Sequence, residues 1–349
     1  MTKYISKLTL YSLAILFFFF SLLFTATSAD SSQGHSVLTA TFELLHLPIV
    51  LRQATPTLVP TPTSTPIGVT PWLEYVNQFR TQANLPPLIE NSDWSYGDWL
   101  HSRYVVKNDY PGHDEDPSNP WYTPEGAVAG ASGNVMATEW KEAPDEYAID
   151  EWMTAPFHGI CIIDPELQTT GFGSYRDAVG LYQMGATLDV LRGLSNIPPE
   201  TTFPILYPKS EGRIWTLSYS GGELPNPWSS CPGYGMDGRS GPPIMIQIGS
   251  GDQTPNVSAT SFTQGSTPLD HCVFDETNYY NPYPIDQDLG RSVLNTRDAI
   301  VIMPRSPLVD GQIYSVNVNV NGAVYSWSFT ATTSPFRSQP LYEETVQIH

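Results

Sequence analysis

The spacing of apolar residues changes near position 193, and this change limits the folds open to the chain. Before it, apolar side chains recur at helical intervals, as at Trp72, Tyr75 and Phe79, which share one face of a helix. After it, short β-rich segments alternate with proline and glycine. The sequence therefore predicts an α+β domain over residues 71–193 and an all-β domain over residues 194–335.

The first of these domains is expected to alternate helices with a few strands. Thr70 can cap a helix that starts at Pro71, a residue favoured at the first helical position. A second helix is predicted from about Ser92 to Val106, with Tyr96, Leu100 and Tyr104 on its apolar face. The remaining expected elements are a loop over 108–135, a helix from about Pro144-Asp145, and strands at 171–173 and 180–190.

The second domain has the pattern of a β-sandwich. Between Ile313 and Thr330, apolar residues alternate with polar ones on either side of Asn321-Gly322, a favoured type I′ hairpin turn. Tyr314 opens a late strand after a corner, so it is either a tyrosine corner or an ordinary exposed strand tyrosine. Other candidate strands are 243–248, 256–262, 271–274 and 299–303.

The N-terminus predicts export from the cell. Lys3 and Lys7 precede an almost unbroken apolar run, Leu8 to Phe24, and small residues follow before Asp30. This order is typical of a signal peptide over residues 1–29, although an apolar run of about 17 residues also approaches the length of a membrane anchor. Cleavage would leave a secreted, extracellular protein without a membrane span.

Two terminal segments are expected to flank the folded domains. Residues 30–70 are rich in proline and threonine and predict a semi-rigid linker, and residues 336–349 predict a C-terminal tail.

Charge excludes two classes of partner. The chain has 35 acidic residues against 16 lysines and arginines, a net charge of −19. An acidic chain repels phosphate, so nucleic-acid binding and attraction to anionic lipid headgroups are both disfavoured. The partner is instead expected to be an unknown extracellular ligand or cell-surface component.

Ordered short motifs cover roughly a third of the chain. In order they are Val76 to Arg80, Leu85 to Leu88 with Asn91, His101, His113, Pro120 to Gly126, Gly133-Asn134-Val135, Glu151 to His158, and Gly171-Phe172-Gly173. This set resembles the bacterial CAP or SCP-like domains of the cysteine-rich secretory, antigen 5 and pathogenesis-related superfamily. The resemblance implies an α-β-α sandwich with a central cleft, here followed by an Ig-like β-sandwich.

The resemblance also implies a candidate site. Family members line the cleft with two histidines and two acids, which can hold a divalent metal such as zinc. The histidines correspond to His113 and His158. The acids are missing, because Gly133 and Ala155 stand at their positions. Glu115, Glu125 or Asp114 could substitute for them.

Further residues join this candidate site. Asn134, Tyr122 and Glu125 are predicted ligand-binding residues beside the two histidines. For Trp121 and Tyr122, packing in the core is preferred to a place in the cleft wall. Cys161 is a possible metal ligand, but a buried apolar role is preferred. His101 is interpreted as structural.

The acidic run 114–116 lacks the alternating spacing of a calcium loop and is expected to be solvated. Cys231 and Cys272 are the candidate disulfide pair.

These observations favour a secreted, non-catalytic CAP protein. It would bind a small ligand, a surface component or a divalent cation in a cleft lined by two histidines. No Gly-x-Ser-x-Gly, His-Glu-x-x-His or phosphate-loop motif is present. The alternatives are a metal-dependent, protease-like hydrolase that uses the same cleft and a structural surface protein with a vestigial cleft.

Overall fold

The computed structural model describes residues 70–333 and 346–348, all within one compact unit. The expected signal peptide, nearly all of the Pro/Thr-rich linker and most of the C-terminal tail lie outside the described residues. Within the described ranges, no helix combines the length and apolar character needed to cross a bilayer.

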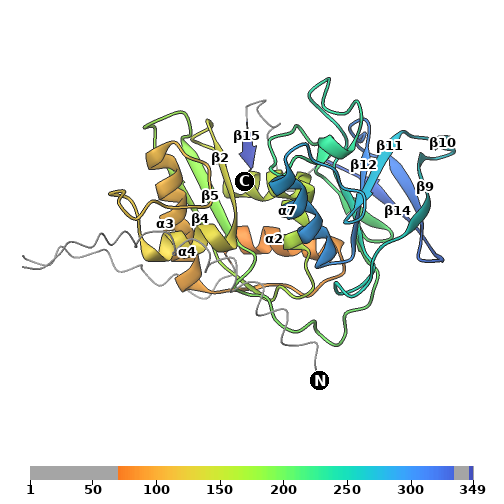
Figure 1. Cartoon of the computed structure of the whole chain (residues 1–349), viewed down its shortest axis with the longest axis horizontal. Helices are drawn as coiled ribbons and strands as arrows, with labels where there is room; N and C mark the ends of the chain where they lie inside the picture. Colours follow the sequence, from red (N-terminus) through yellow and green to blue (C-terminus); the bar gives the residue numbers. More distant parts are fainter. Residues whose placement is uncertain (1–69, 334–345, 349) are drawn as a thin grey trace, which may run out of the picture. The chain divides into compact units, whose positions relative to one another are not determined.

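The N-terminal part is a mixed helix-and-sheet structure, consistent with a CAP α+β fold (Figure 1). Its four-stranded sheet has the order β15-β2-β5-β4. Its helices are α2 (Pro71–Gln82), α3 (Ser92–Asn108), α4 (Pro124–Ser132), α5 (Asp145–Thr154) and α6 (Pro156–Ile162), and its strands are β1 (Ile89–Glu90), β2 (Gly133–Thr138), β3 (Thr169–Thr170), β4 (Phe172–Arg176), β5 (Met184–Asp189) and β15 (Val346–Ile348).

Strand β2 shows why helices cover both faces of this sheet. All six of its residues are buried, so neither face is open to water. Val135 and Ala137 pack with Val105 of α3 in a small cluster. The residue between them, Met136, belongs to the main core with the apolar residues of α2 and α5. The strand alternation therefore assigns its side chains to two separate layers.

Several expectations for this part are confirmed and others are wrong. Helices begin at Pro71 and Ser92 as predicted. However, the side-chain oxygen of Thr70 donates to Glu90 rather than capping α2. Tyr96 is 47 % exposed, so it does not share the buried face of Leu100 and Tyr104.

The expected loop over 108–135 is also wrong in part, because it contains α4 and the start of β2. The glycine-rich composition of this segment favoured a loop. The segment nevertheless forms α4, which Thr123 caps by accepting a hydrogen bond from the Gly126 amide.

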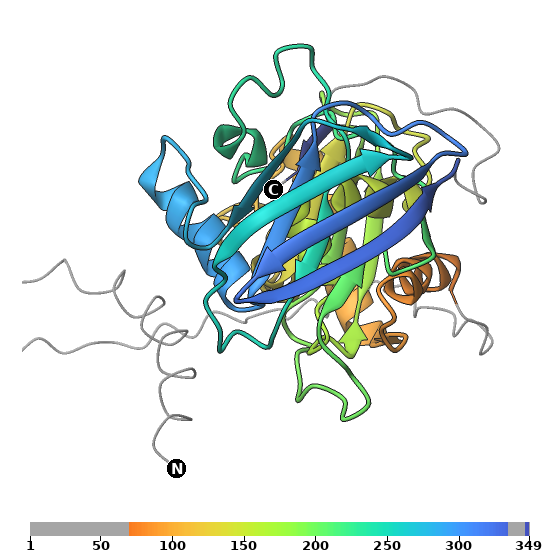
Figure 2. The same ribbon diagram turned by 90° about the vertical axis from the view of Figure 1, so that its right-hand side faces the viewer.

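The C-terminal part contains two further sheets, visible in front of one another in Figure 2. One has the order β10-β9-β13-β14-β7 and the other β11-β12-β8-β6. The strands are β6 (Ile205–Tyr207), β7 (Gly212–Ile214), β8 (Ile244–Gln247), β9 (Val257–Gln264), β10 (Thr267–Pro268), β11 (His271–Asp275), β12 (Ala299–Pro304), β13 (Ile313–Val320) and β14 (Ala323–Ala331), with η1 (Pro227–Ser230) and α7 (Pro284–Asn295) between them.

The predicted hairpin is present in this part. Strands β13 and β14 pair antiparallel on either side of Asn321 and Gly322, whose φ angles are 51° and 79°. These positive angles are those of a type I′ turn.

Two features of the C-terminal part differ from the all-β expectation. Helix α7 lies between β11 and β12, where no helix was predicted. Strand β15, which we expected within the tail, pairs antiparallel with β2, so the chain returns to the first sheet.

The two parts share one hydrophobic core. A single cluster of buried side chains extends from Trp72 to Ala331. Trp215 lies at the junction, where its ring centroid is 4.5 Å from that of Phe79 and its indole donates to the Tyr75 hydroxyl at 3.0 Å. Cys231 and Cys272 form a disulfide that closes the loop between them. The β-rich part therefore stabilises the helices that carry the candidate site.

We predict that Tyr314→Phe destabilises the fold by about 1–2 kcal/mol. The Tyr314 ring is buried, and its hydroxyl accepts the Val309 amide at 2.8 Å, as a tyrosine corner would. The substitution leaves that amide without its acceptor. Urea unfolding measures the loss, and Tyr283→Phe, at a 69 % exposed ring, is the control that should show none. Equal stability of the two variants would contradict this role.

Candidate functional site

A buried histidine–glutamate pair lies among the helices of the N-terminal part. The Nδ1 atom of His101 lies 3.0 Å from Oε1 of Glu115, and neither side chain is exposed. The Nε2 atom of His101 faces the Gly112 carbonyl at 3.0 Å, so it must carry a hydrogen, because a carbonyl only accepts. Both ring nitrogens are therefore engaged, and His101 has none left for a ligand.

Two glycines of α4 make room for this pair. A Cβ atom at Gly126 would lie 2.5 Å from Oε1 of Glu115, and one at Gly130 would lie 2.6 Å from Nδ1 of His101. Contacts this short are not possible for real Cβ atoms. The glycine-rich sequence of α4 thus permits the helix to approach the His101–Glu115 pair closely.

His113 lies next to this pair and keeps one ring nitrogen free. Its Nδ1 atom donates to the Gly130 carbonyl at 2.8 Å, which leaves a lone pair on Nε2 when the ring is neutral. Burial lowers the pKa of His113; the hydrogen bond to the Gly130 carbonyl opposes this shift, and the nearby rings of His158 and His101 add to it, so the pKa lies below its ordinary value. The ring is therefore held neutral, the form that binds metals.

His158 is held by an acid from the other part of the chain. Its Nδ1 atom lies 2.8 Å from Oε1 of Glu223. The same oxygen accepts the amides of Phe157 and His158 at the start of α6, at 2.8 and 3.0 Å. Burial raises the pKa of Glu223, while its bond to His158 opposes that rise.

Glu223 supplies the hydrogen-bond acceptor for the start of α6 that the side chain of Ala155 lacks. Ala155 precedes α6 and has no side chain that could cap it. The Glu223 carboxylate accepts those amides instead, from 66 positions beyond Phe157. Sequence reasoning missed this residue, because nothing in its local motif, Gly222-Glu223-Leu224, marks it as a partner of His158.

The absence of an acid at Gly133 has a steric cause. A Cβ atom at Gly133 would lie 2.9 Å from both the Leu188 carbonyl oxygen and Cγ2 of Thr187. The strand pairing of β2 with β5 is therefore too close for a glutamate at this position. Glu115, one of the acids that could substitute, is buried but bonded to His101 and to the Thr123 amide.

The other predicted ligand residues differ in burial and in their hydrogen bonds. Asn134 is buried, and its Nδ2 atom donates to the His158 carbonyl at 3.2 Å, so it belongs to the cluster. Tyr122 is half-buried, with no side-chain bond recorded within the described ranges, and Glu125 is exposed at the start of α4. Cys161 is buried, and burial raises the pKa of its thiol, so it remains a thiol that bonds the Phe157 carbonyl.

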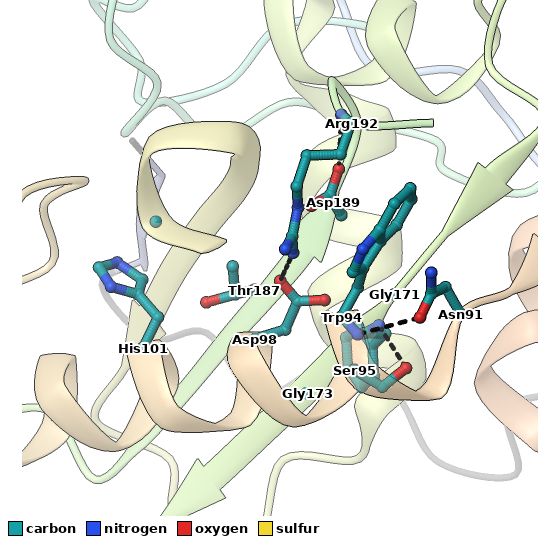
Figure 3. A network of polar contacts seen from close by, with 12 residues as sticks. Asn91, Trp94, Ser95, Asp98, His101, Gly171, Gly173, Thr187, Asp189 and Arg192 are labelled. Carbon is teal, nitrogen blue, oxygen red and sulfur yellow. Dashed lines mark hydrogen bonds and ion pairs between the residues drawn. The ribbon is translucent and has the colours of Figure 1, made fainter. Parts of the chain in front are cut away.

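A second polar network lies along α3 from His101 (Figure 3). Arg192 pairs with Asp189 and lies above Trp94, with Cζ 4.9 Å from the ring centroid. Asp98 is fully buried, and neither of its oxygens has a hydrogen-bond donor among the described residues. Its nearest cation, Nη2 of Arg192, is 3.8 Å away. Burial, and then the neighbouring Asp189, raise the pKa of Asp98 well above its ordinary value.

The two imidazoles of His113 and His158 meet only part of what a metal site requires. In both His113 and His158, Nδ1 is bonded to a carbonyl or carboxylate oxygen, as is usual for histidines that bind a metal through Nε2. Across residues 70–333 and 346–348, no three histidine, cysteine or acidic side chains come together as a possible metal site. Two imidazoles alone suit an exchangeable cation rather than a closed four-ligand zinc site.

Comparison with protein families agrees with this architecture. Residues 73–188 match the model of the cysteine-rich secretory protein family, CAP. The matched range includes α3 to α6, His113 and His158, and it supports a CAP-superfamily protein. A search of curated proteins finds no match to the chain.

We predict that Gly130→Ala destabilises the protein by about 1–3 kcal/mol, because the added methyl group must displace His101 or the His113 backbone. Denaturant unfolding measures the loss. Val128→Ala, on the same helix at a half-exposed side chain, should change stability little. A Gly130→Ala variant as stable as the wild type would show that α4 can move away from the pair at no cost.

We predict that Asp98→Asn becomes more stable relative to the wild type as pH rises. A raised folded-state pKa means that Asp98 stabilises the native state fully below its unfolded pKa, and this stabilisation is lost as pH rises through the folded pKa. The difference in free energy of unfolding between the variant and the wild type should grow by up to about 1.4 kcal/mol per pH unit. Urea unfolding between pH 4 and 8 measures it.

Asp93→Asn is the control for this pH series, because Asp93 is exposed on the same helix. It should show at most a small, nearly constant difference. If the Asp98→Asn difference were equally constant, Asp98 would be ionised in the fold at neutral pH.

Proposed function

We propose that this is a secreted, non-catalytic CAP protein that binds an exchangeable divalent cation through His113 and His158. The proposal depends chiefly on one observation, that each ring has Nδ1 bound to an acceptor while no bond engages its Nε2 within the described residues. This arrangement fixes the ring and its tautomer before a cation arrives. A small ligand or surface component would then complete the coordination of the cation.

The acids around the two histidines argue against catalysis. Glu115 is bound to His101 and the Thr123 amide, and Oε1 of Glu223 accepts three bonds from Phe157 and His158. A metal-dependent hydrolase uses a carboxylate to take the proton from a metal-bound water. Of the oxygens of Glu115 and Glu223, only Oε2 of Glu223 has no hydrogen-bond partner among the described residues, and that atom is buried. Cys161, the nearby thiol, is buried and protonated, so it does not serve as a nucleophile.

One contact favours the alternative of a hydrolase. In the His158–Glu223 pair, a carboxylate orients Nδ1 of an imidazole, as in the base of a catalytic dyad. Turnover of casein, lipid esters or peptidoglycan by the wild type, lost in His158→Gln, would support this alternative and overturn the non-catalytic proposal.

The extracellular setting is part of the proposal. The features of residues 1–29 support export, and CAP proteins are commonly secreted. The C-terminal sheets and the bonded Tyr314 hydroxyl support an Ig-like sandwich that presents the CAP part. Detection of the mature chain in culture medium, with its N-terminus at Asp30, would test the export step.

We predict that His113→Ala and His158→Gln abolish cation binding. Zn²⁺ added to metal-free wild type should release heat in calorimetry and raise the melting temperature. His271→Ala is the control, since His271 lies on β11 and bonds Thr260 and the Leu269 carbonyl. Neither heat nor a thermal shift for the wild type, or an equal loss in His271→Ala, would contradict the cation site.

A further inference from the structure

The outer face of α3 carries a continuous row of aromatic and basic side chains. Tyr96, Trp99, Arg103 and Lys107 succeed one another at intervals of three or four residues, so they share one helix face. Two residues from other segments, Trp121 and Tyr175, extend the row. We call these six residues the aromatic–cation strip.

The strip is held together by ring contacts. The rings of Tyr96 and Trp99 stack with centroids 5.9 Å apart, and Trp99 meets Tyr175 edge-on at 5.7 Å. Nζ of Lys107 lies 5.1 Å from the Trp121 ring centroid. Tyr96 and Trp121 are 47 % and 37 % exposed, so part of this aromatic surface faces water.

Arg103 is the unusual member of the strip. Its Cζ atom lies 5.2 Å from the Trp99 centroid and 5.5 Å from the Trp121 centroid, so the guanidinium contacts two indoles. Its Nε atom is buried without a hydrogen-bond partner, and no carboxylate pairs with it among the described residues. Lys107, by contrast, is neutralised by Asp177.

An arginine without an acid is unexpected in this chain. Acidic residues outnumber lysines and arginines by 35 to 16, so a carboxylate partner was readily available. The flanking indoles hold the guanidinium in place by cation–π attraction and leave its hydrogen-bonding edge for another group. The guanidinium of Arg103 is therefore a preorganised hydrogen-bond donor for one anionic group, held between two indole rings.

The strip is separate from the histidine cluster. His101 and Asp98 are fully buried on the other face of α3, toward the sheet and α4. Tyr175 lies on β4, which is the edge strand of the sheet. From Tyr96 to Lys107 the helix rises about 16 Å, enough for a short oligosaccharide to lie along it.

We propose that the aromatic–cation strip binds an acidic polysaccharide with uronic-acid residues. Pyranose rings have an apolar face that packs on exposed aromatic rings, and the planar fork of arginine matches a carboxylate in two hydrogen bonds. Within the strip, Arg103 has no acidic partner among the described residues, whereas Lys107 pairs with Asp177, so the strip can bind one sugar carboxylate. An anionic lipid surface or a nucleic acid presents many phosphates at once and would require several lysines and arginines. A short oligosaccharide needs only one carboxylate at Arg103 and can place its other sugars on the aromatic rings.

The test measures binding of the full chain to polygalacturonate oligomers by calorimetry and by quenching of tryptophan fluorescence. Neutral galactan oligomers are the matched polymer. The wild type should bind polygalacturonate with an affinity that falls with salt. Arg103→Gln and Trp121→Ala should each weaken it by roughly tenfold or more, equivalent to about 1.4 kcal/mol.

Arg305→Gln is the matched control, because Arg305 lies over a single ring, that of Tyr234, in the β-rich part. It should bind as the wild type does, and circular dichroism should show all variants folded. The proposal is wrong if the wild type binds neither polymer, if galactan binds equally well, or if Arg103→Gln has no effect. Binding to anionic vesicles but not to polygalacturonate would instead identify a lipid surface.

Discussion

Glu223 links the β-rich part of the chain to the helix layer that carries the candidate site. One oxygen of its carboxylate accepts the first amides of α6 and the ring of His158. Without it, α6 would begin at Ala155 with no cap and His158 would lose the group that orients it. The position of a histidine in the CAP part therefore depends on a residue that lies beyond the matched family range of 73–188.

This dependence agrees with the shared core. Trp215 packs on Phe79 and bonds Tyr75, and the side chain of Gln247 donates to the Ile163 carbonyl at the end of α6. Such contacts bury the surface that the helices would otherwise expose to water. We infer that the histidines keep their geometry only while the β-rich part is folded against them.

The sequence predicted the elements with strong local signals. Alternation and Asn321-Gly322 identified the β13–β14 hairpin, and Pro71 identified the start of α2. It missed α4, whose glycines disfavour a helix, and it also missed α7, although Pro284 stands at the first position of that helix and Asp286 in its first turn. In α4, glycines that normally weaken a helix are needed for close packing on His101 and Glu115.

For the site, the sequence by itself predicted His113 and His158 as the two histidines, and it showed that Gly133 and Ala155 carry no acidic side chain. Only the tertiary structure decided which acids pair with histidines, because Glu115 reaches His101 and Glu223 reaches His158 through packing of the folded chain rather than through a sequence motif. The same holds for the aromatic–cation strip, since Trp121 and Tyr175 join α3 only once the sheet edge is formed. Local patterns encode helices and turns, whereas contacts between distant side chains exist only in the folded chain.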